Sequence, residues 1–234
     1  MFNRIKLGLS AGLVSALVLT ASARANTLMF DFGEINTPTG SNYNNVTQSQ
    51  LPIFNALDTT GAGTGIGLVT SGFNPGSNTN GTLAPGGAAA IFHSEATRDN
   101  LFGHTVNFNQ PAPLPLATLA LTGLDGSGAT SYDFVFFASR TGVSDVRETQ
   151  YAITGANSGT GYLNTSNNTD NVAVVSGIIP NALGEVTIAV SPGPNNNNSS
   201  GFYYLGAMQI TSVPEPASLA LLGLGGILVA ARRR

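Results

Sequence analysis

The chain has 234 residues, of which 42% are hydrophobic and only 9% are charged, so one domain of ordinary size fits between its two ends. Residues 26–216 contain three arginines, no lysine and all twelve acids, a formal net charge of −9 that excludes a nucleic-acid-binding role. The chain has no cysteine. Disulfides, cysteine nucleophiles and cysteine-ligated zinc are therefore excluded, and the fold must rest on its hydrophobic core.

The first 25 residues have the features of a secretory signal peptide. Two basic residues precede an uncharged apolar stretch at residues 7–20, which predicts the signal-peptide helix. Ala23 and Ala25 supply the small side chains that a signal peptidase requires, so we expect cleavage before Asn26 and export by the secretion machinery. The alternative is an uncleaved membrane anchor, for which fourteen apolar residues are short.

Residues 26–212 show no long helical periodicity. Short apolar runs are separated by clusters of Gly, Asn, Pro and Ser, which is typical of an all-β domain. The runs that predict strands are 27–32, 65–70, 88–93, 105–108, 116–121, 132–139, 149–154, 171–176, 185–191 and 202–211. Nine or ten short strands predict a single β-sandwich with a jelly-roll-like arrangement.

Some of these runs allow a finer prediction. Aromatic residues at 132–139 fall on both parities, so this strand should be central and buried on both faces, with 149–154 as its pairing partner. The run at 185–191 alternates, so its Val and Ile side chains should point inward. The stretch 191–200, rich in Asn and Pro, is predicted to be a surface loop.

A series of short motifs runs along this domain. They are Asp31-Phe32-Gly33, Tyr43-Asn44-Asn45-Val46-Thr47, Leu121-Thr122-Gly123-Leu124-Asp125, Tyr132-Asp133-Phe134, Ala138-Ser139-Arg140, Asn167-Asn168-Thr169 and Tyr204-Leu205-Gly206-Ala207-Met208-Gln209-Ile210. Their order is similar to that of galactose-binding-like β-sandwich modules of secreted bacterial proteins. The resemblance implies the sandwich fold and a carbohydrate ligand. Such modules often carry Trp where Tyr43 stands, whereas this chain has no Trp.

Three residues are candidates for ligand binding. Arg140 and Arg147 bracket a short connection between two predicted strands, and Asp145 and Glu148 lie beside them. A guanidinium next to a tyrosine can bind a sugar or a carboxylate. Tyr43 is the third candidate, because it stands where galactose-binding-like modules often carry Trp. The alternative is an ion pair at the rim of the fold, which contributes about 0–1 kcal/mol.

The segment 164–171 is a candidate calcium site. It reads Asn-Thr-Ser-Asn-Asn-Thr-Asp-Asn and supplies many of the oxygen ligands that Ca²⁺ prefers, with Asp170 as its only charge. It lacks the spaced acids of an EF-hand loop. The alternative is a turn whose side chains bond their own backbone. Beyond this structural ion, no metal or cofactor is expected.

Catalysis is not the favoured function. A Ser–His–Asp hydrolase is conceivable from Ser94, His104 and Asp99, and His93 is the second of the two histidines. No Gly-x-Ser-x-Gly elbow positions the serine. We therefore expect no catalytic residues, and keep a secreted hydrolase of polysaccharides or esters as the alternative.

The C-terminal segment 213–234 has three parts. Val213-Pro214-Glu215-Pro216 comes first, and its two prolines keep it extended. An uncharged run of fifteen residues at 217–231 follows and predicts a membrane helix that is short for a stable span. Arg232, Arg233 and Arg234 end the chain and should stay cytoplasmic, because arginines are costly to translocate.

This order of Pro-Glu-Pro, short apolar helix and terminal arginines resembles the PEP-CTERM sorting signal. The resemblance implies processing by an exosortase, an integral-membrane cysteine transpeptidase of Gram-negative bacteria that often make exopolysaccharide. The inner membrane would then be a transient partner, and the final location the cell envelope or the outside. We expect a non-enzymatic surface or matrix protein that binds glycans weakly, in association with exopolysaccharide or biofilm. A purely structural matrix or surface-layer component is the other alternative.

Overall fold

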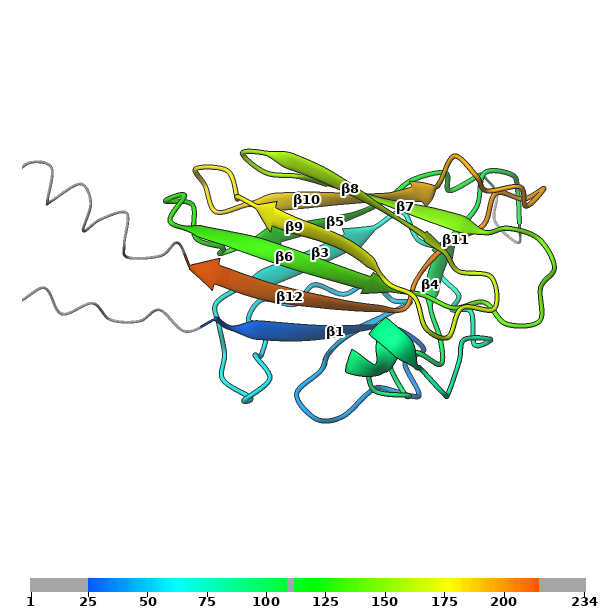
Figure 1. The fold of residues 1–234 in the computed structure, drawn as a ribbon, viewed down its shortest axis with the longest axis horizontal. Coiled ribbons are helices and arrows are strands. Elements are labelled where there is room, and N and C mark those ends of the chain that lie inside the picture. Colours follow the sequence, from blue (N-terminus) through cyan, green and yellow to red (C-terminus); the bar gives the residue numbers. More distant parts are fainter. Residues whose placement is uncertain (1–24, 109–111, 215–234) are drawn as a thin grey trace, which may run out of the picture. The chain divides into compact units, whose positions relative to one another are not determined.

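The computed structural model describes residues 25–108 and 112–214 (Figure 1). All of them belong to one unit, Arg24–Pro216. Most of the predicted signal peptide, Ala23 included, and the predicted membrane helix at 217–231 lie outside the described residues. In the part of the chain that is described, no helix is long and apolar enough to cross a membrane.

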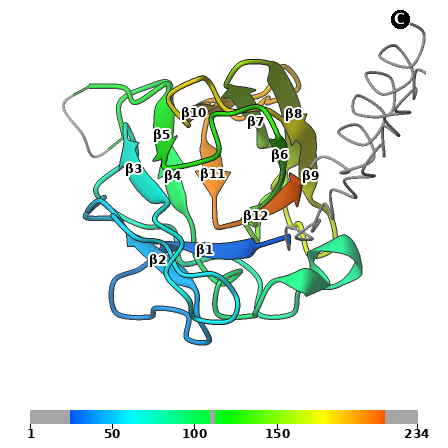
Figure 2. The same cartoon turned by 90° about the vertical axis from the view of Figure 1, so that its left-hand side faces the viewer.

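The first of two five-stranded sheets contains both ends of the domain (Figures 1 and 2). Its strand order is β2-β1-β12-β6-β9, and all pairs are antiparallel except β1 with β2. The strands are β1 (Thr27–Gly33), β2 (Asn44–Thr47), β6 (Thr130–Phe137), β9 (Ala173–Ile178) and β12 (Ala207–Pro214).

The second sheet packs against the first and is antiparallel throughout, in the order β3-β5-β10-β7-β8. Its strands are β3 (Gly67–Ser71), β5 (Ala117–Thr122), β7 (Glu148–Thr154), β8 (Ser158–Asn164) and β10 (Val186–Pro192). A separate two-stranded sheet pairs β4 (Leu101–Gly103) with β11 (Tyr203–Leu205). The all-β prediction is therefore confirmed, and the arrangement is a β-sandwich.

Alternating side chains of the two sheets build one hydrophobic core. Val186, Ile188 and Val190 of β10 are each at most 1% exposed, as the alternation predicts. On β6, Phe134 and Phe136 point into this core, while Phe137 joins a second apolar cluster on the outer face of the first sheet. The 3₁₀ helix η1 (Gly87–Ile91) and its neighbours cover that outer face. The prediction that this strand is buried on both faces is confirmed only towards its C-terminal end, because Ser131, Asp133 and Val135 on the outer face are half-buried.

The predicted pairing of 149–154 with 132–139 is wrong. Strand β7 lies in the second sheet, between β10 and β8. The rings of Phe136 and Tyr151 stack across the core with centroids 4.4 Å apart. The connection between β6 and β7 therefore crosses from one sheet to the other instead of closing a hairpin.

Two further predicted strands are absent where they were expected. Residues 88–93 contain η1 instead, because alanine has a low preference for strands and Gly87 begins the turn with a positive φ of 50°. At 105–108 no strand forms, and the neighbouring residues 101–103 pair with β11 as β4.

The sequence also gave no indication of β2 and β8. In β8, Gly159 and Gly161 lie so close to β9 that a Cβ on Gly159 would come within 2.5 Å of Val175 Cγ1. These glycines permit close packing of β8 against β9, although a Gly-rich sequence is typical of a turn.

A buried tie connects β7 to β11. The backbone N–H of Tyr204 donates to Thr149 Oγ1 at 3.0 Å, and the Tyr151 hydroxyl donates to the backbone oxygen of Tyr204 at 2.8 Å. Thr149 and Tyr151 are both 0% exposed. A buried backbone group without a partner is costly, so these two hydroxyls help to hold β11, which also pairs with β4.

Replacing Tyr151 by Phe should lower the free energy of unfolding by about 1–3 kcal/mol, because the Tyr204 carbonyl would lose its buried donor. Tyr162→Phe is the matched control, since Tyr162 on β8 is 49% exposed. Chemical denaturation of both variants measures the difference. Equal stability of the two variants would contradict the role of the tie.

Candidate functional site

A pocket of about 390 Å³ lies beside the β4–β11 pair. Its lining residues are Ser77, Asn78, Asn80, Phe102, Phe108, Arg140, Arg147, Phe202 and Tyr204. We call it the arginine pocket. A concave site with aromatic walls and a few polar groups is the usual form of a small-molecule site.

Arg147 is fixed in this pocket by three kinds of contact. Its Nε donates to Asp145 Oδ1 at 3.0 Å, and its Nη1 donates to the Tyr204 hydroxyl at 2.6 Å. Its guanidinium carbon lies 5.3 Å from the ring centre of Phe202 and 6.0 Å from that of Tyr204. These are cation–π distances, so the charged group lies against an aromatic wall.

The charge of Asp145 is maintained by its neighbours. Burial alone would raise the pKa of Asp145, but hydrogen bonds from Arg147 and Asn198 outweigh it and hold the pKa below its usual value. The carboxylate therefore stays ionised at neutral pH and keeps Arg147 in place.

The segment 193–202 closes one side of the pocket. The side chain of Asn198 accepts from the backbone N–H of Phe202 at 3.2 Å, and Asn196 Nδ2 donates to the Phe202 carbonyl at 2.8 Å. Asn197 Oδ1 accepts from the Val146 N–H at 2.7 Å. This predicted surface loop thus uses its asparagines to position Phe202 and to connect to the Asp145–Arg147 segment.

The aromatic wall is built from residues far apart in the sequence. Tyr204 lies directly opposite Phe102 in the β4–β11 pair. Phe108 meets Phe202 edge-to-face, with centroids 5.0 Å apart, and the buried His104 ring packs against both. Edge-to-face contacts of this kind contribute about 0.5–1.5 kcal/mol each.

Arg140 enters the same pocket with its charge unpaired. Its Nη1 donates to the Thr141 carbonyl, and its backbone N–H donates to the Thr165 carbonyl at 2.8 Å. Among the described residues, no carboxylate lies within ion-pair distance of Arg140. The structure thus brings together two of the three predicted ligand-binding residues.

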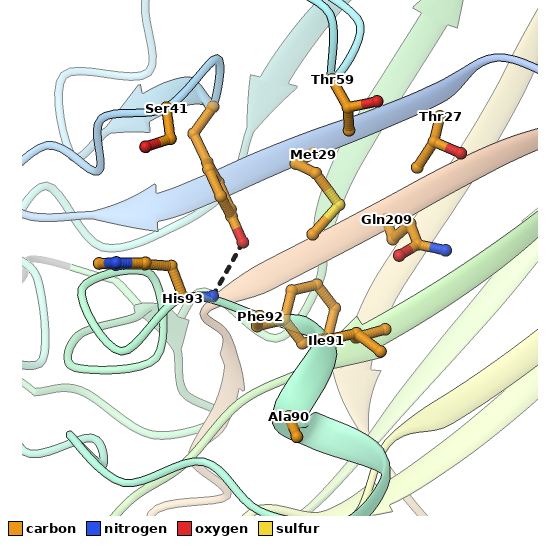
Figure 3. Close-up of a pocket in the computed structure, with 10 residues that line it drawn as sticks. Thr27, Met29, Ser41, Thr59, Ala90, Ile91, Phe92, His93 and Gln209 are labelled. Atoms are coloured by element: carbon orange, nitrogen blue, oxygen red, sulfur yellow. Dashed lines mark hydrogen bonds between the residues drawn. The ribbon is translucent and has the colours of Figure 1, made fainter.

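Tyr43, the third of these residues, lies elsewhere. It lines a shallow pocket of about 440 Å³ on the outer face of the first sheet, and its hydroxyl accepts from the His93 N–H at 3.0 Å. Figure 3 shows Met29 and Gln209 over β1 and β12, with Ile91 at the end of η1 and Phe92 directly after it. Charged groups are sparse there, so the arginine pocket is the better candidate site.

The hydrolase residues do not assemble. The two ring nitrogens of His104 face Asn74 and the Val106 carbonyl. In the described parts of the chain, no hydrogen bond joins Ser94, Asp99 and His104.

Asp170 is exposed, and its carboxylate accepts from the Thr169 hydroxyl at 3.1 Å. Residues 25–108 and 112–214 contain no group of three or more His, Cys, Asp or Glu placed to hold a metal ion. Calcium at Asp170 stays a prediction.

Sequence reasoning found the two arginines but missed the aromatic wall. The triplet Phe202-Tyr203-Tyr204 carried a usable indication, because alternate residues of a strand face the same side. Phe202 and Tyr204 do face the pocket, while Tyr203 points into the core. The Asp145-x-Arg147 spacing was the second indication.

Comparison with known protein families identifies the C-terminal segment. Residues 212–234 match the PEP-CTERM protein-sorting motif. The motif implies export, sorting to the cell envelope or outside, and an exosortase as the processing partner. None of the curated proteins and none of the solved structures compared with the chain matches it. The galactose-binding-like resemblance therefore stays a prediction.

The PEP-CTERM motif begins inside the sandwich. Strand β12 continues to Pro214, and Val213 and Pro214 pair with Ser131 and Thr130 of β6. The final strand therefore extends two residues beyond the expected domain boundary at 212. Glu215, Pro216 and the arginines 232–234 lie outside the described residues.

The other expected processing point lies next to this strand. Ala25 is exposed, and Asn26, the expected first residue after signal cleavage, exchanges hydrogen bonds with Ser212 at 2.8 and 2.9 Å. Both ends of the domain thus leave the sandwich side by side (Figure 1).

Asp99, a candidate triad member, is instead buried in the same region as Asp31, where it accepts from the Thr37 hydroxyl and lies beside Arg98. Asp99 and Asp31 are 1% and 3% exposed, and Asp99 lies against Gly33, two residues along β1 from Asp31. Burial raises the pKa of Asp31 to about 6, and the charge of Asp99 adds to this, while hydrogen bonds from Thr39 oppose it.

This shift predicts a pH dependence of stability. Between pH 4 and 6 the folded protein holds a proton on Asp31 that the unfolded chain has lost, so stability falls as pH rises through this window, by up to about 3 kcal/mol. Asp31→Asn should reduce this fall, as measured by denaturant unfolding at several pH values, and Asp99, whose pKa burial also raises, should account for the fall that remains. Asp58→Asn is the control. Hydrogen bonding from Thr60 lowers the pKa of Asp58, so Asp58 does not cause a fall in stability as pH rises, and this variant should keep the fall. An unchanged pH profile in Asp31→Asn would contradict the prediction.

Proposed function

We propose that this protein is exported, processed by an exosortase, and displayed at the cell surface or in an extracellular polysaccharide matrix, where it binds glycans weakly and without catalysis. The observation that carries the binding part is the arginine pocket, in which Arg147 lies against Phe202 and Tyr204. Aromatic faces suit the apolar faces of sugar rings, and guanidinium and amide groups suit their hydroxyls.

The position of the pocket supports display. The chain enters β1 and leaves β12 at one end of the sandwich, whereas β4, β11 and the connection after β6 lie towards the other end (Figure 1). A ligand site far from both processed ends stays accessible while the C-terminal segment is held at a membrane.

The chemistry of the pocket supports binding without catalysis. Glycoside hydrolysis needs two carboxyl groups on either side of the scissile bond. The described residues that line the arginine pocket include no carboxylate and no histidine. Asp145, the nearest acid in this network, is engaged by Arg147 and Asn198.

Processing predicts a shorter mature protein. In a host that makes an exosortase, the exported protein should lack the C-terminal apolar run, whereas Glu215→Ala should leave a precursor that retains residues 217–234. Intact-mass spectrometry of the membrane and secreted fractions distinguishes the two. Glu95→Ala serves as the control, because the Glu95 side chain is 47% exposed and far along the chain from the motif. Retention of the tail by the unaltered protein would refute processing.

Glycan binding in the arginine pocket predicts a loss of affinity when a residue of the aromatic wall is removed. Phe108 lines the pocket and is 41% exposed, so Phe108→Ala should fold normally and weaken glycan binding about tenfold, the effect of about 1.4 kcal/mol. The matched control is Phe54→Ala, since Phe54 is 81% exposed and does not line this pocket. A glycan array followed by titration calorimetry of the full chain in detergent gives the readout. No binding to any glycan would refute this part, and self-assembly seen by light scattering would favour the structural alternative.

A further inference from the structure

The charge of the sandwich is distributed unevenly. Residues 26–216 contain only three arginines against twelve acids. Arg98 lies beside Asp99, with its Nε 3.9 Å from Asp99 Oδ2. The other two, Arg140 and Arg147, both line the arginine pocket. The positive charge of an acidic domain is thus concentrated at its candidate binding site.

The two guanidinium groups retain donors for a ligand. Arg147 uses Nε for Asp145 and Nη1 for Tyr204, and among the described residues no acceptor engages its Nη2. Arg140 uses only Nη1, for the Thr141 carbonyl, so its Nε and Nη2 have no acceptor in the described structure. A guanidinium with two free neighbouring donors can bind a carboxylate with two parallel hydrogen bonds.

The balance of charge indicates a single negative group. Asp145 compensates Arg147, and no described carboxylate compensates Arg140. One cation therefore remains for the ligand, next to a wall formed by Phe102, Phe108 and Phe202. A pyranose ring with one carboxylate matches both features, because the ring can lie against the aromatic faces while the carboxylate meets Arg140.

We infer that the arginine pocket selects sugars that carry a carboxylate, that is, uronic acid residues of an acidic polysaccharide, with Arg140 as the residue that distinguishes them from neutral sugars. This rests on the proposed glycan binding and specifies its ligand class. Arg147 then acts mainly as part of the wall, since Asp145 and Tyr204 already hold it.

The test compares one oligosaccharide in two chemical forms. A uronic acid oligomer is titrated into the full chain in detergent, alongside the same oligomer after reduction of its carboxyl groups to alcohols. We expect the acidic form to bind at least about tenfold more tightly, in the range that a charge-assisted hydrogen bond contributes. Arg140→Gln should abolish this preference, so that the variant binds the acidic form and the reduced form equally. Arg140→Lys, which keeps the charge but loses the planar fork, should keep part of the preference.

Each outcome has a distinct meaning. Equal binding of both forms, lost in Phe108→Ala, would overturn the selectivity and leave the proposed glycan binding standing. A preference for the acidic form that survives in Arg140→Gln would overturn the assignment to Arg140. No binding of either form would overturn this inference, while other glycans bound on the array would still support the proposed function. Thermal melts of the Arg140 variants confirm that each is folded, and Phe54→Ala controls for unrelated surface changes.

Discussion

Two hydroxyl groups of β7 hold in place the strand on which the arginine pocket is built. Thr149 and Tyr151 pair with the N–H and the carbonyl of Tyr204 in the dry interior, where neither group would find water. The Tyr204 side chain then accepts from Arg147, which in turn holds Asp145. A core contact on one side of β11 therefore defines the binding geometry on the other side.

How far the sequence predicts this fold depends on where the relevant information lies. The alternation in β10 is a local pattern, because every second side chain must enter the core. It was sufficient to predict this strand and its inward-facing residues. The partner of β7 was not predictable, because the Phe136–Tyr151 stack joins two sheets and leaves no trace in either segment. Strand β8 was not predicted for a similar reason. Its glycines are needed only because Val175 of β9 lies against them.

The candidate site also has one part that the sequence predicts and one part that it does not. Arg140 and Arg147 were identifiable because they bracket a short connection between two predicted strands. The wall was not, because Phe102 and Phe202 meet only through the pairing of β4 with β11, one hundred residues apart in sequence numbering. Tyr43, the third candidate, lines a different pocket from the two arginines. The asparagines of 195–198 fit a surface loop by composition, yet the side chains of Asn196 and Asn198 hold Phe202.

The two processing points meet through the first sheet. Beyond Ser212, β12 pairs only with β6, so the missing N–H of Pro214 costs no bond on the side where β1 has ended. Asn26 and Ser212 are 186 residues apart in sequence, so β1 can find its place beside β12 only after nearly the whole domain has been exported. Closing such a long loop is slow compared with forming local pairs. On the export route that the PEP-CTERM motif implies, residues 215–234 of the motif follow β12 directly, so they reach the membrane when β12 becomes available for pairing. The same strand thus completes the first sheet and contains the start of the PEP-CTERM motif. On the proposed route, the exosortase therefore acts on a domain whose first sheet is ready to close.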